Sequence, residues 1–80
     1  MFLYRNLKID SIRALSEGKH IKLTLKDDRT IIQAIGFNLG HFSNEYLIGN
    51  KVDIVGNLEI NEFNGNKMVQ INLKDMRRVI

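Results

Sequence analysis

The sequence lacks cysteine and proline altogether across its 80 residues. The absence of cysteine excludes a disulfide scaffold, an iron–sulfur site and a cysteine-ligated zinc site. Because proline and glycine/serine-rich stretches are missing, no internal linker is visible. No apolar run is long enough to cross a membrane, and charge interrupts the N-terminal apolar residues too early for a signal peptide. The absence of both signals favours a cytoplasmic protein.

What the chain does contain is typical of a small globular protein, with 44% hydrophobic and 26% charged residues. A chain of this length forms one domain and buries only about 60% of the surface that its unfolded form exposes. That is enough for one small core but not for an elaborate active-site cleft as well. The net charge is +3, and the basic excess lies in residues 1–40. A one-sided basic surface favours polyanionic partners, although an ordinary solvated face accounts for the same charge.

Alternation of apolar and polar residues predicts β-strands in the first half of the chain. Residues 20–26 (HIKLTLK) alternate strictly, which indicates a half-buried strand. Two aspartates then predict a turn, and residues 29–37 supply the hairpin partner. Residues 4–15 fit either a strand or a helix, and a bulge near Asp10 and Ser11 would restore the alternation of a strand.

The second half of the chain predicts an insert followed by a hairpin. Residues 38–50 lack alternation and predict one short helical turn around residues 42–45, which packs Phe42, Tyr46 or Leu47 on the core. Residues 51–61 alternate again, with a glycine bend at Gly56. The last strand, residues 68–73, is expected to place Val69, Ile71 and Leu73 inward. Asn64-Gly65 between the two runs is a strong hairpin signal, because a type I′ turn needs positive φ at both central residues.

These segments together predict an all-β fold. The expected architecture is a five-stranded antiparallel Greek-key barrel with a short irregular or helical insert between the third and fourth strands. A long bulged first strand and a glycine-bent fourth strand are typical of the OB-fold. An SH3-like barrel is the main rival, but it usually has shorter strands and no insert at this position. The barrel accounts for residues 1–80 as a single domain.

Groups that could perform catalysis are scarce. A catalytic site needs a cluster of titratable groups held together, and the serines of this sequence lie in no nucleophile motif. His20, on the polar face of its strand, is interpreted as a solvated or hydrogen-bonded histidine. Asp27 and Asp28 have no adjoining ligands that would complete a metal site. We therefore expect no catalytic activity, and no metal or other cofactor, in this chain.

Residues suited to binding are better placed. OB-folds bind single strands on the face of their second and third strands, and with the loops that join strands 1–2 and 4–5. Lys22, Thr24 and Lys26 project outward from the second strand. Lysines at every second position form a row that can follow a phosphate backbone, although a solvated strand face carries the same pattern. Arg29 is a further candidate for contact with the nucleic acid.

Two other candidates lie near the last hairpin and the last strand. Phe63 stands beside Asn64-Gly65, where its ring could stack on a base, close the end of the barrel or dock on a neighbouring domain. Arg77, just past the last strand, could touch a phosphate or simply solubilise the end of the chain. The sequence leaves these alternatives open.

Four segments, taken in order, resemble the OB domain of the RecJ family of single-stranded-DNA-specific exonucleases. They are GKHIKLTLKD (18–27), AIGFN (34–38), VDIVGNLEINEFNG (52–65) and VQINLKDMR (69–77). The likeness covers nearly the whole chain. Family members tend to carry a tryptophan in the hairpin, where this chain has Phe63.

The resemblance implies a module that grips single-stranded DNA beside the catalytic domains of a 5′-to-3′ exonuclease acting in DNA repair and recombination. In that family, Asp and His residues of the catalytic domains hold manganese or magnesium. This chain has no Asp-His-His motif, so the resemblance implies an OB domain excised from a larger protein. Its expected partners are single-stranded DNA and the catalytic domains, and no membrane. The competing interpretation is an interdomain structural or protein-interaction barrel with little nucleic-acid contact.

Overall fold

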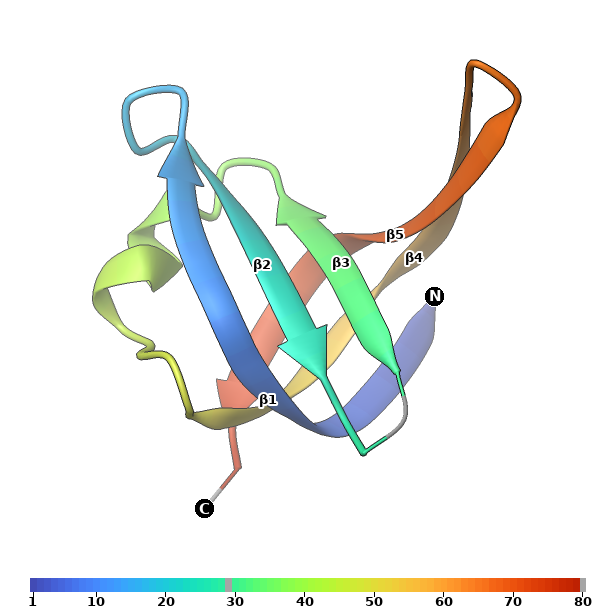
Figure 1. Cartoon of the computed structure of the whole chain (residues 1–80). Coiled ribbons are helices and arrows are strands. Elements are labelled where there is room, and N and C mark those ends of the chain that lie inside the picture. Colours follow the sequence, from blue (N-terminus) through green and yellow to red (C-terminus); the bar gives the residue numbers. More distant parts are fainter. Residues whose placement is uncertain (29, 80) are drawn as a thin grey trace.

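The computed structural model describes residues 1–28 and 30–79, apart from the side chains of Asn61, Phe63 and Met68. Within these residues, the chain forms five β-strands and one turn of 3-10 helix (Figure 1). In chain order they are β1 (Phe2–Leu15), β2 (His20–Lys26), β3 (Ile31–Gly36), η1 (Gly40–Asn44), β4 (Lys51–Phe63) and β5 (Asn66–Arg78). The strand interpretation of residues 4–15 is therefore confirmed. In the described part of the chain, no helix is long and apolar enough to span a membrane.

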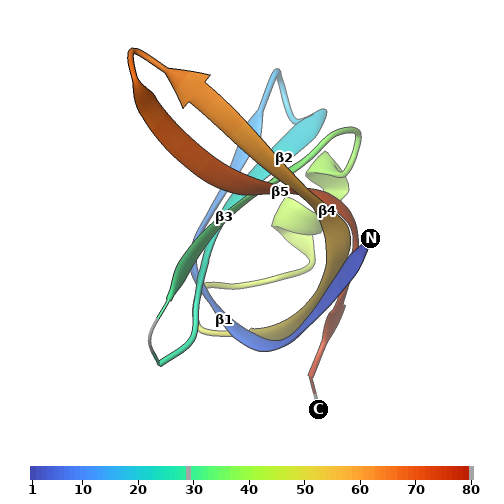
Figure 2. The same ribbon diagram turned by 90° about the vertical axis from the view of Figure 1, so that its right-hand side faces the viewer.

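The strands close into a barrel in the order β1-β2-β3-β5-β4 (Figure 1 and Figure 2). β1 pairs with both β2 and β4, antiparallel in each case. β3 and β5 run parallel instead, which corrects the expected purely antiparallel polarity, while the barrel itself is confirmed. The reason is geometric. Around a closed ring with an odd number of strands, up and down cannot alternate all the way, so one neighbouring pair must run in the same direction.

β1 bends at a bulge between Ile9 and Ser11, where its pairing with β2 shifts register. This is the bulge expected near Asp10, and its position is confirmed. The extra residue returns Ile12 to the core side, where its side chain packs against the buried cluster. The bulge also turns the polar side chains that follow it onto the outer face shared with β2.

A second irregularity, which the alternation pattern does not reveal, separates Tyr4 from Leu7 in the pairing of β1 with β4. Asn6 has a φ of 61° here, a left-handed conformation that asparagine tolerates better than most residues. The backbone N–H of Asn6 donates to Oδ1 of Asp53 on β4 at 2.9 Å. A carboxylate thus satisfies a donor at the point where the register of the ladder shifts.

Inward-facing aliphatic side chains fill the interior of the barrel. The alternation expected for β2 is confirmed, because its isoleucine and both leucines are fully buried. The buried cluster consists of Leu7, Ile9, Ile21, Leu23, Leu25, Ala34, Phe42, Tyr46, Val52, Ile54, Ile71, Leu73 and Met76. Each fully buried Leu or Ile side chain stabilises such a fold by about 1.5–3 kcal/mol.

η1 lies in the insert between β3 and β4 and packs against β1 and β2 (Figure 1). Phe42 and Tyr46 are buried in the core, whereas Leu47 is 71% exposed. Of the three residues proposed to pack on the core, Phe42 and Tyr46 therefore do so and Leu47 does not. The Tyr46 hydroxyl donates to the carbonyl oxygen of Met76 at 3.1 Å, and burial raises the pKa of Tyr46. The insert is thereby tied to the end of β5.

β4 and β5 continue past the barrel as a projecting hairpin (Figure 2). Its turn lies at Asn64 and Gly65, whose φ values are 50° and 79°. Positive φ at both central residues is therefore confirmed, as the Asn-Gly signal predicts. Glycine carries no penalty in this conformation, and asparagine only a small one.

Val69 is an exception to the inward alternation expected for β5. Ile71 and Leu73 are buried as expected, but Val69 is 54% exposed, so that part of the prediction is wrong. The reason is its position along the strand. Val69 pairs with Ile60 in the projecting hairpin. There the sheet extends beyond the barrel, so the face that covers the core elsewhere has no core to cover (Figure 2).

Gly56→Ala is expected to destabilise the barrel by about 1–3 kcal/mol. A Cβ atom at position 56 would lie 2.5 Å from the carbonyl oxygen of Asn72 and 2.6 Å from Cγ2 of Ile71. Those residues cannot retreat freely, because β5 is also paired with β3 there. Urea denaturation measures the loss as a lower midpoint. Asn57→Ala, at the exposed neighbouring position, is the control and should stay within about 0.5 kcal/mol of wild type; equal midpoints for both variants would contradict the close approach.

Candidate functional site

The outer face of β2 carries the side chains that alternation assigns to it. Lys22 is exposed, and Thr24 and Lys26 are half-buried. The leucines between them are fully buried, so these three polar side chains share one face. The structure thus brings together three of the site residues proposed from the sequence.

β1 and β3 flank this face and complete a shallow groove of about 330 Å³. Arg13 of β1 lies directly opposite Lys22, and Ser11 lies opposite Thr24. On the other side, Gln33 of β3 also lies opposite Thr24. We call this strip the β2 groove, and its lining is Ser11, Ile12, Arg13, Lys22, Thr24 and Gln33.

Arg13 and Ser11 are absent from the site proposed on the sequence, although a signal for them exists. The bulge at Asp10 shifts the phase of β1 by one residue, and that shift places Arg13 opposite Lys22. Extending the alternation of β1 beyond the expected bulge would have found both residues. Which residues of β2 lie opposite them, however, depends on the register between the two strands.

An ion pair compensates the charge of Lys26, which adjoins the β2 groove, but not the charges of the cations that line the groove. Nζ of Lys26 lies 3.1 Å from Oδ1 of Asp10, an exposed ion pair of a kind that contributes little to stability. Among the described residues, Arg13 and Lys22 form no ion pair, and they stand directly opposite each other. Like charges in that position repel, so an anion between them would relieve a repulsion that the folded chain carries.

An exposed aromatic ring marks the end of the same face. Phe37 directly follows β3 and is 50% exposed. Its ring centroid lies 5.3 Å from that of His20, in an edge-to-face arrangement. The N–H of Asn38 donates to Nδ1 of His20 at 2.9 Å, which confirms the interpretation of His20 as a hydrogen-bonded histidine. The alternation of β3 puts Phe37 in phase with Gln33, yet the sequence-based site omits it.

Arg77 lies on a different wall of the barrel. Its Nε donates to Oδ2 of Asp53 on β4 at 3.1 Å, and its side chain is 74% exposed. Because β3 separates β5 from β2, Arg77 does not join the β2 groove. Arg29 and the side chain of Phe63 lie outside the described residues, so their contacts with nucleic acid stay predictions, as does that of Arg77.

Asp53 connects three β-strands at this second wall. Its backbone belongs to β4, while its carboxylate accepts the N–H of Asn6 from β1 and the Nε–H of Arg77 from β5. The hydrogen bond from Asn6 is the main cause that lowers the pKa of Asp53, and Arg77 adds to it against partial desolvation. The ionised carboxylate therefore stabilises the junction of β1, β4 and β5.

Groups suited to metal binding are not gathered in the part of the chain that the structure describes. No three His, Asp or Glu side chains there lie close enough together to hold a metal ion. The imidazole of His20 is engaged with Asn38. The ring of His41 packs on that of Phe42, with centroids 4.5 Å apart. Polar residues do come together in the β2 groove and beside Lys8 and Lys51.

A closed barrel of this strand order, with its insert between β3 and β4, defines an OB-fold protein. The chain belongs to the RecJ OB domain family, whose family model matches residues 1–75. It is 31% identical over 74 residues to the single-stranded-DNA-specific exonuclease RecJ of Bacillus subtilis (strain 168). The match covers 91% of this chain but only 9% of that relative. The resemblance noted in the sequence is thereby confirmed.

Asp53→Asn is expected to lower the stability of the fold at neutral pH and to matter less in acid. The folded-state pKa of Asp53 lies below its ordinary value of 3.8. The carboxylate therefore stabilises the fold above the unfolded-state pKa, and this contribution is lost as the pH falls through the folded-state pKa. Urea midpoints of wild type and variant should differ at about pH 7 and converge as the pH falls through the folded-state pKa of Asp53.

Arg77→Gln is the companion variant, because it removes one of the two partners of Asp53 and keeps the hydrogen bond from Asn6. It is expected to cause a smaller loss of stability than Asp53→Asn at neutral pH. A midpoint difference for Asp53→Asn that persists unchanged in acid would contradict the assignment of this stability to the ionised carboxylate.

Proposed function

We propose that the chain binds single-stranded DNA in the β2 groove and serves as the DNA-binding module of a RecJ-type exonuclease. The observation that carries the proposal is the opposed pair of cations, Arg13 and Lys22, on the same outer face as the exposed ring of Phe37. Membership of the RecJ OB domain family supports it. So does the likeness to a single-stranded-DNA-specific exonuclease.

Each part of the groove suits one part of a single-stranded nucleic acid. Arg13 and Lys22 neutralise phosphates, and Thr24 and Gln33 offer hydrogen bonds beside them. Phe37 presents a ring on which a base stacks. Phosphate and stacking contacts discriminate little between bases, so the proposed binding has little dependence on the DNA sequence.

Further contacts extend the proposal beyond the groove. Lys26 and Arg29 would continue the line of cations, Phe63 would provide a second ring in the projecting hairpin, and Arg77 would meet phosphate on the second wall. These contacts add to the proposed interface, and none of them replaces the opposed pair of cations in the β2 groove.

The cleavage chemistry belongs to other parts of the proposed protein. We place this chain as one domain, residues 1–80, of a longer cytoplasmic enzyme that acts in DNA repair and recombination. Catalytic domains that use manganese or magnesium would lie beside it, and the chain itself would cut no DNA. Holding the strand next to those domains raises its effective concentration at the site of cleavage.

Docking on a neighbouring domain is a second candidate function, and the projecting hairpin favours it. Leu58 and Val69 of the hairpin, together with Ile31 of β3, line an apolar hollow of about 260 Å³ and are exposed. The occupant that we propose is an apolar patch of the rest of the exonuclease, because the chain spans 9% of the length of its curated relative. The hollow and the β2 groove are lined by different residues, so substitutions can separate the two functions.

Lys22→Gln and Arg13→Gln are each expected to weaken the binding of a labelled oligothymidine and to flatten its salt dependence. Each lost phosphate contact lowers the slope of log K against log salt by about 0.7, which corresponds to about fivefold in affinity at about 0.1 M salt. Fluorescence anisotropy over a salt series measures both quantities. Lys74→Gln removes the same charge from β5 and is expected to change neither. Equal effects from all three variants would indicate general attraction by charge and contradict a site in the β2 groove.

Phe37→Ala is expected to weaken the same binding by about 1–3 kcal/mol and to leave the salt slope unchanged, because stacking releases no counterions. Phe37→Tyr keeps an aromatic ring and should bind like wild type. A thermal melt of each variant separates lost stacking from lost folding. Equal losses for the two variants, or a flatter salt slope for Phe37→Ala, would count against a stacking role.

A further inference from the structure

Three lysines form a row across neighbouring strands of the barrel. Lys8, in the middle of β1, lies directly opposite Lys26 on β2 and also opposite Lys51 on β4. Neighbouring strands are about 4.8 Å apart, so the backbones of Lys26 and Lys51 are separated by roughly 10 Å. Buried core residues adjoin each lysine along its strand, and the three side chains therefore share the outer face. We call these residues the lysine row.

Folding alone gives no reason for the lysine row. Like charges at directly opposed strand positions destabilise a sheet, and here one lysine faces two others. Asp10 lies 3.1 Å from Lys26, but within the described residues neither Lys8 nor Lys51 forms an ion pair. Uncompensated cations held together by the fold attract anions. The lysine row therefore suits a negatively charged ligand.

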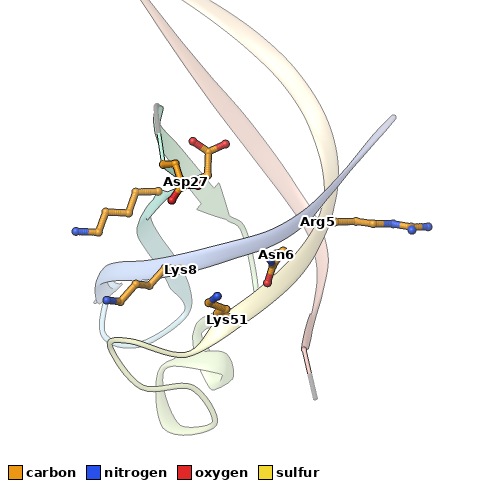
Figure 3. A pocket seen from close by; sticks show the side chains of 7 residues that line it. Arg5, Asn6, Lys8, Asp27 and Lys51 are labelled. Carbon is orange, nitrogen blue, oxygen red and sulfur yellow. The ribbon is translucent and has the colours of Figure 1, made fainter.

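A cleft of about 560 Å³ adjoins the lysine row. Figure 3 shows Lys8 and Lys51 close together on it, while the side chain of Arg5 points away from them. The acidic part of the lining comes from the β2–β3 turn, where Oδ1 of Asp27 accepts the N–H of Thr30 at 2.8 Å. The full lining is Arg5, Asn6, Lys8, Lys26, Asp27, Asp28 and Lys51. Cations outnumber carboxylates in this cleft, and the lysines of β1 and β4 occupy adjacent positions.

The lysine row meets the β2 groove at Lys26, which ends the line of outward side chains on β2 and also begins the row. We propose that the lysine row binds the phosphodiester backbone of single-stranded DNA that leaves the β2 groove, and carries it across β1 to β4. This inference rests on the proposed function. A continuous polyanion can occupy the β2 groove and the lysine row at once. An acidic peptide bound to the lysine row alone would not explain why the row meets the groove at Lys26.

Two oligothymidines of different length test this path. One OB-fold covers about 4 to 16 nucleotides, so an oligomer near the lower limit fills the β2 groove, and one near the upper limit reaches the lysine row as well. The Lys8→Gln/Lys51→Gln double variant should bind the long oligomer about 25-fold more weakly at about 0.1 M salt, with a slope lower by about 1.4. Its affinity for the short oligomer should stay within about twofold of wild type.

Lys22→Gln and Lys74→Gln are measured beside the double variant. Lys22→Gln should weaken both oligomers, and Lys74→Gln should weaken neither. If the double variant binds the long oligomer like wild type while Lys22→Gln weakens both lengths, the path over the lysine row is overturned and the proposed function stands. If neither variant changes the binding of either oligomer, both proposals fail.

An oligoglutamate distinguishes an acidic protein segment from DNA as the ligand. The backbone amide NMR signals of Lys8 and Lys51 should shift on titration with the long oligothymidine. If they shift only with oligoglutamate, the ligand is an acidic peptide and the inference is overturned. Thermal melting adds a check on the premise, because removal of repelling charges should leave the Tm of the double variant equal to that of wild type or higher. A lower Tm would show that the lysines serve folding instead.

Discussion

β1 pairs with β4 along its first half and with β2 along its second half, and the barrel closes only because one strand serves both partners. Lys8 is the residue at which the two pairings overlap. The irregularities on either side of it, at Asn6 and at Asp10, supply the bend. A straight β1 would extend a flat sheet and leave unpaired edges. Asp53 secures the first irregularity by accepting the N–H of Asn6.

The same bend determines which side chains meet on the surface. The bulge at Asp10 places Arg13 opposite Lys22, and the overlap at Lys8 places lysines of β2 and β4 on its two sides. These cations are distant from one another in the chain and are gathered by closure of the barrel. The proposed path of the DNA therefore runs along β2 and then crosses β1, the strand that joins β2 to β4. A change that straightened β1 would disturb the fold and the binding surface together.

The elements could be predicted from local patterns, whereas contacts between distant segments could not. Strand period and the Asn-Gly turn are local properties, and they predict the strands and the last hairpin that the structure confirms. The polarity of β3 and β5 depends on closure of the ring, which no single segment encodes. Alternation misplaces Val69, because it predicts which face of the sheet a residue takes but not whether that face is covered. In the site, alternation predicts the outward side chains Lys22, Thr24 and Lys26 of β2. The position of Lys51 beside Lys8 depends instead on the register of β1 with β4.

Two pairings of the barrel, β3 with β5 and β1 with β4, join strands that lie far apart in the chain. The pairs β1 with β2, β2 with β3 and β4 with β5 are neighbours in sequence. Loop-closure entropy must be overcome before distant pairings form, so the local hairpins come first and the ring closes last. Proteins dominated by non-local strand pairings fold in roughly milliseconds to seconds. Until both distant pairings have formed, the chain has free strand edges, and it is then most exposed to aggregation.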